Sequence, residues 1–348
     1  MTESEKLLTP EELNPATAVA NRVLEQLDRI LLGRADLHRM ILIGILSRGH
    51  VLLEGLPGLG KTALVHTLGR ILELEFKRVQ FTPDLMPGDI LGTHILQETK
   101  DGKREMMFQS GPVFTNILLA DEINRASPKT QSAMLETMQE KSVTLLGTTR
   151  PLPDPFFVLA SQNPIELEGT YPLPEAQLDR FLFRLLFDDI GPEVMEAIIS
   201  QRRRGELPPP TWTLSTHQLA KLFGAMERMV LPRPVASYIA RLVASTHPQS
   251  PAATPLVKQY VTYGASPRAA IAIAEAARGH GLLNGRPTVG FEDVRAVTQA
   301  VLNHRMILNY QARFDRISAT TVVHELMECI NESGLHLPED VGMQQAAG

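Results

Sequence analysis

Two kinds of hydrophobic periodicity alternate along the first 190 residues. Residues 15–33 and 34–49 carry apolar side chains at helical spacing, and a short, almost continuous apolar run, HVLLEG, follows at 50–55. Such a run next to turn residues predicts a strand buried on both faces. Helical spacing returns at 61–74, and further apolar runs follow in FKRVQFT, TNILLADE, PFFVLASQNP and FLFRLLF. Strands separated by helical connections predict an α/β fold with a parallel, doubly wound sheet.

Two segments interrupt this alternation. In residues 92–114, the dipeptide Asp101-Gly102 separates two extended runs and is a hairpin turn signal. Residues 141–153 are again strand-like, with Gly147 at the expected turn. Both segments lie between predicted core strands, and neither hairpin has to be part of the main sheet.

The pattern changes after Phe187. Residues 205–212, GELPPPTW, contain three prolines and predict a stiff connector, because proline prevents a helix from continuing. The apolar patterns beyond it are helical. We therefore predict a flexible N-terminus, an α/β domain, a linker, a smaller all-α domain and a C-terminal tail, at 1–14, 15–190, 191–212, 213–335 and 336–348.

Composition narrows the class of protein. The chain has 348 residues, of which 43% are hydrophobic, enough for one large or two ordinary domains with substantial cores. A net charge of -5 gives no electrostatic footprint for nucleic acid as the main ligand. The apolar run Met40–Leu46 is far shorter than the roughly 20 residues of a membrane-spanning helix. The polar, acidic N-terminus predicts no secretory signal.

Cysteine and histidine usage adds two expectations. The single cysteine, Cys329, fits a reducing compartment, so we expect a cytoplasmic protein. Cys329 lies in a helical pattern and is expected to be a small buried side chain; a reactive thiol is the alternative. The ten histidines form no cluster with metal-ligand spacing.

The segment GLPGLGKT, Gly55–Thr62, fits the phosphate-binding pattern G-x-x-x-x-G-K-[ST]. Glycines let successive backbone N–H groups converge on phosphate oxygens. Lys61 can reach the terminal phosphates, the Thr62 hydroxyl can ligate Mg²⁺, and the following helix directs its positive N-terminus at the anion. A chance glycine loop is the alternative, but a predicted strand before the motif and a helix after it favour nucleotide binding.

A second motif, ILLADEIN, ends a predicted strand with two acids. Asp121 at the strand end can hold Mg²⁺, and Glu122 can act as general base on an attacking water. An exposed acidic turn is the alternative when this motif is considered alone. Together with the phosphate loop, it favours nucleotide hydrolysis.

Three further residues are candidates for the same chemistry. Asn163 follows another predicted strand and can orient the water; an ordinary Asn-Pro turn is the alternative. Arg180 precedes the last strand and can stabilise transition-state charge; Arg184 is a weaker candidate within that strand. Arg268 follows a capping serine in the first turn of a helix, where a cation opposes the helix dipole and suggests a bound anion. A surface arginine is the alternative at positions 180 and 268.

The order of these motifs resembles that of the AAA+ ATPases and, within them, the MoxR family. GLPGLGKT is similar to the family's Walker A motif, LLADEINRA to Walker B and SQNP to sensor 1. Residues 168–181 resemble the arginine-finger segment, and GASPRA resembles sensor 2. The resemblance covers roughly residues 15–335.

This resemblance implies the fold in more detail. The parallel five-stranded sheet of a P-loop AAA+ domain has the order 5-1-4-3-2. The hairpin at Asp101-Gly102 corresponds to the helix-2 insert, and residues 142–150 correspond to the hairpin before sensor 1. The second domain corresponds to the helical lid.

The resemblance also implies the cofactors, ATP and Mg²⁺, and the roles of particular residues. Glu122 would be the base, Asn163 sensor 1, Arg268 sensor 2, and Arg180 a finger acting on a neighbour's ATP. Thr62 and Asp121 would serve Mg²⁺, and no other protein-held metal is expected. The nucleotide-binding residues would be Leu32, Gly33, Gly55, Leu56, Pro57, Gly58, Leu59, Gly60, Lys61, Thr62 and Ala63.

An arginine finger implies a shared site and hence a homo-oligomer, with a hexameric ring as the family expectation. The resemblance further implies a chaperone that remodels or matures proteins, with von Willebrand factor A domain partners and metal or cofactor insertion as its expected context. A DNA-directed motor is the second hypothesis, but the near-neutral segment THILQETKDGKREMMF does not favour nucleic acid. A chelatase-like subunit and a non-hydrolysing switch remain alternatives.

Overall fold

The computed structural model describes residues 7–56, 58–98, 104–163, 169–187, 190–202 and 206–332. The chain divides into two compact units, which we describe separately. The first comprises Met1–Arg228 with Leu282–Arg286, and the second comprises Met229–Gly281 with Pro287–Gly348.

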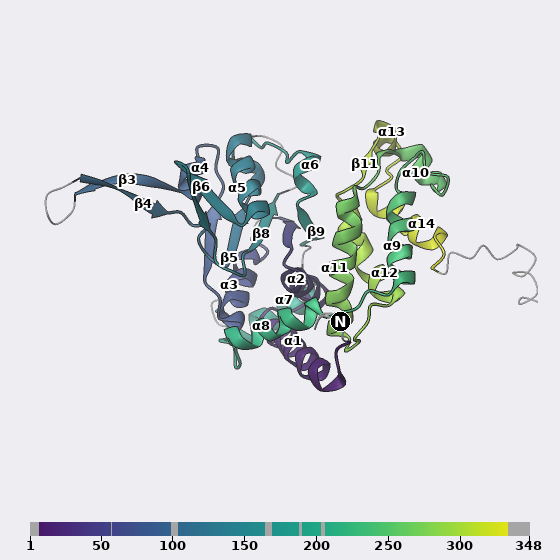
Figure 1. Cartoon of the computed structure of the whole chain (residues 1–348), viewed down its shortest axis with the longest axis horizontal. Helices are drawn as coiled ribbons and strands as arrows, with labels where there is room; N and C mark the ends of the chain where they lie inside the picture. Colours follow the sequence, from purple (N-terminus) through teal and green to yellow (C-terminus); the bar gives the residue numbers. More distant parts are fainter. Residues whose placement is uncertain are drawn as a thin grey trace, which may run out of the picture. The chain divides into compact units, whose positions relative to one another are not determined.

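A five-stranded parallel sheet forms the centre of the first unit (Figure 1). Its order is β2-β5-β8-β1-β9, with bounds Phe76–Gln80, Ile117–Asp121, Phe157–Gln162, His50–Glu54 and Phe181–Leu186. Numbered as core strands along the chain, this order is 5-1-4-3-2, so the predicted topology is confirmed. The carboxyl ends of β1, β5 and β8 therefore lie next to one another, where ligands bind in open parallel sheets.

The inner strands are apolar because both faces of the sheet are covered. All five residues of β1 are buried, and only the last residue of β5 and of β8 is partly exposed. The edge strand β2 is mostly exposed or half-buried. The helices of this unit include α1, α2, α3 and α5, with bounds Pro10–Ile30, Ala35–Leu46, Lys61–Leu72 and Pro128–Glu140. Within this framework, α2 packs against β1 and β9, while α3 packs against β2 and β5.

Two antiparallel hairpins stand apart from the sheet, as the sequence predicts. The first pairs β3 (Gly92–Glu98) with β4 (Arg104–Ser110) after the short helix α4 (Pro87–Leu91), and it extends away from the sheet (Figure 1). Its predicted turn at Asp101-Gly102 lies outside the described residues. The second pairs β6 (Ser142–Leu145) with β7 (Thr148–Pro151) directly after α5.

A helix occupies the first half of the predicted linker at 191–212. Helix α7 spans Pro192–Gln201 and begins with proline at a position where the missing N–H costs nothing. None of its residues is fully buried. The extended proline-rich segment is confined to the residues that follow, described from 206.

Helix α8 (Thr216–Glu227) belongs to the first unit, whereas the sequence assigned it to the all-α domain. Ser215 caps its N-terminus through the N–H of Gln218, and Leu219 and Leu222 are buried. The buried face of α8 packs on α1 and α2. This packing explains why the contacts divide the chain at Arg228.

The second unit is mainly helical. Its helices α9 to α14 have bounds Arg233–Ser245, Pro255–Tyr260, Pro267–Leu283, Phe291–Leu302, Tyr310–Phe314 and Ala319–Cys329. A small antiparallel pair, β10 (Val261–Tyr263) with β11 (Ile307–Leu308), interrupts the predicted all-α pattern. None of the helices in the described parts of the chain is long and apolar enough to span a membrane.

Cys329 is exposed, so the expectation that it is buried was wrong. Seven residues separate it from Val322, which places both on one face of α14. Val322 and Leu326 are buried, but Cys329 is the last residue of the helix. The buried part of this helix face therefore ends at Leu326, about one turn before Cys329.

Candidate active site

The phosphate loop, Gly55–Thr62, connects the end of β1 to the start of α3. Gly58 and Gly60 have positive φ angles of 83° and 99°, which residues with a Cβ rarely adopt. A Cβ built on either glycine meets nothing within 4 Å, so both border open space rather than packed protein. At Gly55, by contrast, a Cβ would lie 2.3 Å from the Phe187 carbonyl oxygen, so this glycine is needed for close packing.

Lys61 is the first residue of α3 and lies beneath the loop. Its Nζ donates a hydrogen bond to the Gly55 carbonyl at 2.5 Å. Burial lowers the pKa of Lys61, and the charges of Asp121 and Glu122 oppose that shift. The ammonium group is therefore fixed inside a site whose nearest charges are acidic.

A cavity of about 440 Å³ brings the predicted motifs together. It lies at the carboxyl ends of the parallel strands and is lined by Gly58, Gly60, Lys61, Thr62, Ala63, Arg78, Gln80, Asp121, Glu122 and Asn163. The loop glycines, the lysine, the hydroxyl of Thr62 and both acids thus share one cavity, although the motifs are up to about 100 residues apart in sequence. We refer to it as the phosphate cavity.

Asp121 is the last residue of β5 and accepts hydrogen bonds at both carboxylate oxygens. Ser161 Oγ donates to Oδ1 at 2.5 Å, and Arg78 Nη2 donates to Oδ2 at 2.8 Å. Ser161 is on β8, and Arg78 is on the edge strand β2. The carboxylate is therefore oriented from the strands on both sides of β5.

Glu122 has a left-handed backbone conformation, with φ of 56° and ψ of 49°. Its N–H donates to Ser161 Oγ at 3.0 Å. Its Oε2 accepts from Gln80 Nε2 at 2.7 Å and from Arg125 Nη1 at 2.9 Å. Left-handed geometry is uncommon for a residue with a Cβ and often occurs at functional sites. Here it sets the direction of the carboxylate at the edge of the cavity.

Sequence reasoning missed Arg78, Gln80 and Ser161. Arg78 and Gln80 alternate on β2 and therefore share one face of the strand. Gln80 is paired with Asp121 in the sheet register. Polar side chains at the end of a strand beside the acidic strand were the available signal.

Other predicted residues lie outside the phosphate cavity. Arg180 follows the short helix α6 (Glu175–Leu178) and is half-buried. Arg184 donates to the buried Glu54 at 2.8 Å, so it holds β9 to β1 within its own chain. Arg268 is in the second unit, in the first turn of α11. The roles predicted for Arg180 and Arg268 therefore stay predictions.

The predicted base-binding segment also has a defined geometry. Leu32 and Gly33 form a turn between α1 and α2, and Gly33 has φ of 83°. A Cβ on Gly33 would lie 2.7 Å from the methyl groups of Val194 on α7. Both the backbone angle and this contact require glycine. Pro57 lies outside the described residues.

The groups around the phosphate cavity fit a magnesium-bound nucleotide. Open space at Gly58 and Gly60 leaves room for phosphate oxygens beside the backbone, and Lys61 supplies a fixed positive charge. The oxygen atoms of Thr62 and Asp121 are hard ligands of the kind Mg²⁺ prefers. A nucleotide and its metal therefore match the donors that line the cavity.

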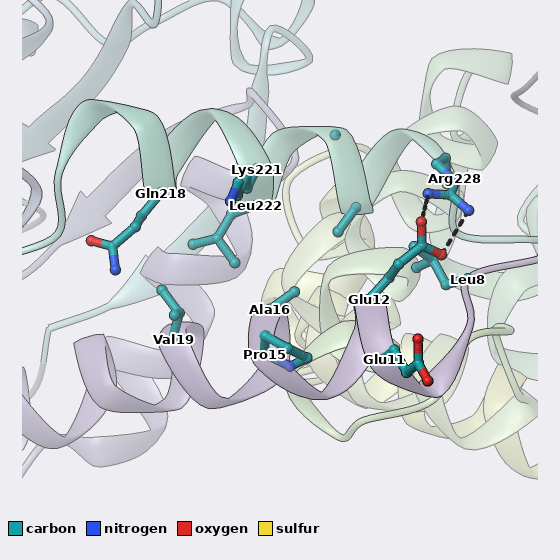
Figure 2. Close-up of a pocket in the computed structure, with 12 residues that line it drawn as sticks. Leu8, Glu11, Glu12, Pro15, Ala16, Val19, Gln218, Lys221, Leu222 and Arg228 are labelled. Atoms are coloured by element: carbon teal, nitrogen blue, oxygen red, sulfur yellow. Dashed lines mark hydrogen bonds and ion pairs between the residues drawn. The ribbon is translucent and has the colours of Figure 1, made fainter.

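A second cavity of about 510 Å³ lies between α1 and α8 in the same unit (Figure 2). Its lining includes the apolar side chains of Leu8, Val19 and Leu222. Glu12 and Arg228 face each other at one end, with hydrogen bonds of 2.6 and 2.9 Å that help to lower the pKa of Glu12 to about 2. Its lining comes from α1, α8 and the segment before α1, so this cavity is separate from the phosphate cavity.

Comparison with known proteins gives matches over most of the chain. Residues 50–183 match the family described as ATPase family associated with various cellular activities (AAA), and residues 254–326 match the AAA lid domain. The chain is 44% identical to Chaperone MoxR1 of Mycobacterium tuberculosis, over 89% of this chain and 81% of that protein. It is 31% identical to Protein MoxR of Methylorubrum extorquens, over 83% and 88% of the two chains.

A solved structure is also similar to this chain. A crystal structure from Cytophaga hutchinsonii, described as a candidate ATPase, has a TM-score of 0.85 and 38% sequence identity. The match covers 92% of this chain and 97% of that one. The similarity therefore includes the α/β unit and most of the helical unit.

Proposed function

This chain belongs to the MoxR family of chaperone-like AAA+ ATPases, and we propose that it hydrolyses ATP to ADP and phosphate with Mg²⁺. One observation carries the proposal: the phosphate loop, Asp121 and Glu122 share a single cavity. A nucleotide-binding protein without hydrolysis would need the loop but not a general base directed at the same space.

The residues of the phosphate cavity have different proposed roles in binding and hydrolysis. Loop N–H groups and Lys61 bind and orient the phosphates, while Thr62 and Asp121 hold the metal. Bound Mg²⁺ would neutralise charge on the phosphate oxygens. Glu122 accepts a proton from the attacking water, and Asn163 orients that water. Hydrogen bonds from Gln80 and Arg125 hold the Glu122 carboxylate in place until then.

We assign Arg180 as a finger that completes the site of a neighbouring subunit, and Arg268 as a lid residue that senses the nucleotide. Arg180 supports this assignment by lying outside the phosphate cavity of its own chain. A site completed by the next subunit requires head-to-tail contacts, which close into a ring. A homo-hexamer is the proposed form.

The work of the ring is proposed to be the remodelling or maturation of partner proteins in the cytoplasm. The relative named as a chaperone supports a protein client. Von Willebrand factor A domain proteins, with metal or cofactor insertion, are the proposed partners and context.

The test is the ATPase rate per subunit as a function of protein concentration, with the mass of the assembly measured in parallel. We expect the rate to rise as rings form. Glu122→Gln and Arg180→Ala should assemble and bind ATP, yet hydrolyse it at least about 100-fold more slowly. Arg70→Ala is the matched control, because Arg70 is an exposed arginine on α3.

Full activity in a monomer, together with normal activity of Arg180→Ala, would overturn the shared site. Normal activity of Glu122→Gln would overturn hydrolysis by this cavity. The Arg70→Ala control should match wild type in both rate and mass.

A further inference from the structure

We propose that Arg34 is a positioning residue for the phosphate loop, fixing the Leu59–Gly60 peptide so that the Gly60 N–H faces the phosphates. This inference rests on the proposed nucleotide-binding function. Arg34 precedes Leu59 of the phosphate loop by 25 residues, so the inference assigns a role in the loop to a residue outside the motif.

Two contacts on different sides hold the Arg34 side chain. Its Nη1 donates to the Leu59 carbonyl oxygen at 2.8 Å. Its guanidinium carbon lies 3.9 Å from the centroid of the Phe187 ring, which is 2% exposed. A guanidinium stacked on a buried ring and hydrogen-bonded at its edge has little rotational freedom. The donor aimed at Leu59 is thus held in place.

Peptide geometry carries this constraint across to the phosphate cavity. The Leu59–Gly60 peptide is planar, and in a trans peptide the C=O and N–H groups point in opposite directions. Arg34 holds the C=O on one side, so the Gly60 N–H is directed to the other side. Gly60 lines the phosphate cavity, whereas Arg34 lines a different cavity beside Gly33. We infer that the N–H faces the phosphates.

The positive charge of Arg34 also strengthens that N–H as a donor. A cation bound to a carbonyl polarises the peptide, and linked hydrogen bonds reinforce each other in a low-dielectric environment. Gly60 is free to follow this orientation because it has φ of 99° and a Cβ there would meet only open space.

Phe187 relates this contact to the first residue of the loop. Its N–H donates to the Glu54 carbonyl at 2.6 Å, and its own carbonyl packs directly on Gly55. Phe187 is therefore fixed at the point where the loop begins. Arg34, stacked on Phe187 and bonded to Leu59, connects the beginning of the loop to its far side. A lysine at position 34 could supply the positive charge. It could not stack as a plane on the Phe187 ring or donate in a fixed direction to Leu59.

The first test compares ligands with and without phosphate. In competition against a fluorescent ADP analogue, Arg34→Ala should raise the Kd of ADP and ATP roughly tenfold, because a charge-assisted hydrogen bond is lost. The Kd of adenosine, which carries no phosphate, should stay within about twofold. Arg34→Lys should give an intermediate effect, as should Phe187→Leu, which removes the ring but keeps an apolar side chain.

The second test needs no nucleotide. Hydrogen–deuterium exchange of residues 58–64 in the full chain should be faster in Arg34→Ala than in wild type. Arg39→Ala is the matched control. Arg39 lies on α2, the helix that follows Arg34, and donates a hydrogen bond to Asn284, so exchange of the loop and the Kd of ADP should not change. Should Arg34→Ala fail to fold, Arg34→Lys and Phe187→Leu decide the question.

Unchanged Kd values for ADP in all three variants would overturn the proposal, and so would unchanged exchange in the loop. An equal loss for adenosine and ADP would also overturn it, since it would indicate a contact with the base. A wild-type protein that binds no nucleotide would refute the proposed function instead, while the exchange experiment would still decide what Arg34 does to the loop.

Discussion

Asp121 and Glu122 are neighbours in sequence, yet different groups hold their carboxylates. Asp121 is bound by Ser161 and Arg78, and Glu122 by Gln80 and Arg125. The peptide between them turns because Glu122 is left-handed. The structure therefore allows Asp121, the proposed metal ligand, and Glu122, the proposed base, to be altered one at a time.

His50, outside the active site, connects three elements through its ring. Its Nδ1 accepts the Val158 N–H at 3.1 Å, and its Nε2 lies 3.0 Å from the Met138 carbonyl. Because a backbone N–H bonds to Nδ1, the ring is neutral and Nε2 donates. Burial lowers the pKa of His50 from its ordinary 6.5 to about 4.

This pKa predicts a loss of stability in acid. On acidification the unfolded chain binds the proton first, so the free energy of unfolding should fall as the pH drops from about 6.5 to about 4. The full loss is about 3 to 4 kcal/mol, because the pKa falls from 6.5 to about 4 and each pKa unit corresponds to about 1.4 kcal/mol. Denaturation followed by the fluorescence of Trp212, the only tryptophan, measures this free energy of unfolding in the first unit.

Two variants isolate the contribution of His50. His50→Gln should be less stable than wild type at pH 7 but lose less stability between pH 7 and pH 5. His217→Asn changes an exposed histidine on α8, and its free energy of unfolding should match that of wild type at both pH 7 and pH 5. Equal losses in wild type and His50→Gln would contradict the assignment to His50.

The residues that the sequence predicted at the site are those whose spacing is set by a ligand. Gly58, Gly60 and Lys61 follow one another closely because the proposed nucleotide would place its phosphates against all of them. Arg78 instead reaches Asp121 across the β2–β5 pairing, 43 residues away, and Arg34 reaches Leu59 between separate segments. Such contacts depend on the tertiary structure. The polar end of β2 could mark Arg78 as a candidate, but its partner Asp121 follows only from the strand order.

At the scale of elements, apolar patterning was sufficient where a helix or strand buries a face. The five core strands and the hairpins were predicted because they combine apolar runs with turn residues. Helix α7 was missed because it buries no residue completely and is followed by a proline-rich segment. Its first proline resembles a breaker in sequence but starts the helix in the structure.

Helix α8 provides a prediction for the first unit. Leu222 is 1% exposed, so Leu222→Ala should lower the free energy of unfolding by about 2–5 kcal/mol. The adjacent Lys221 is exposed, and Lys221→Ala should change it by less than about 0.5 kcal/mol. Trp212 lies three residues before the N-cap of α8, Ser215, and its fluorescence reports the unfolding.

The outcome separates two assignments of α8. A large effect on the Trp212 transition supports a helix that is part of the α/β unit. If Leu222→Ala left that transition unchanged, α8 would contribute to the second unit, as the sequence analysis expected.

At the scale of the whole molecule, the sequence predicted the family and sheet order through its motifs, but not where the chain divides. The division at Arg228 depends on which helices α8 contacts, and its own periodicity fits either unit. In the proposed ring, each active site contains residues from two neighbouring subunits. Such a shared site is tested best by mixing two variants that are each inactive alone.

Mixing Glu122→Gln with Arg180→Ala should restore activity. An interface is intact where an Arg180→Ala chain supplies Glu122 and its Glu122→Gln neighbour supplies Arg180. Random mixing of equal amounts makes about a quarter of the interfaces intact, so up to about a quarter of the wild-type rate is expected. The recovery is measured by comparing the ATPase rate of the mixed rings with the rates of rings assembled from each variant alone. No recovery in mixed rings of confirmed mass would contradict action between subunits.

The left-handed backbone of Glu122 places catalysis and stability in conflict at one position. A left-handed residue with a Cβ is about 1–2 kcal/mol less favourable than glycine. Glu122→Gly should therefore melt at a higher temperature than Glu122→Ala, although both lack the carboxylate and should be inactive. Selection for stability alone would favour glycine here. We therefore expect glycine at this position in a relative that has kept the fold but lost the proposed hydrolysis.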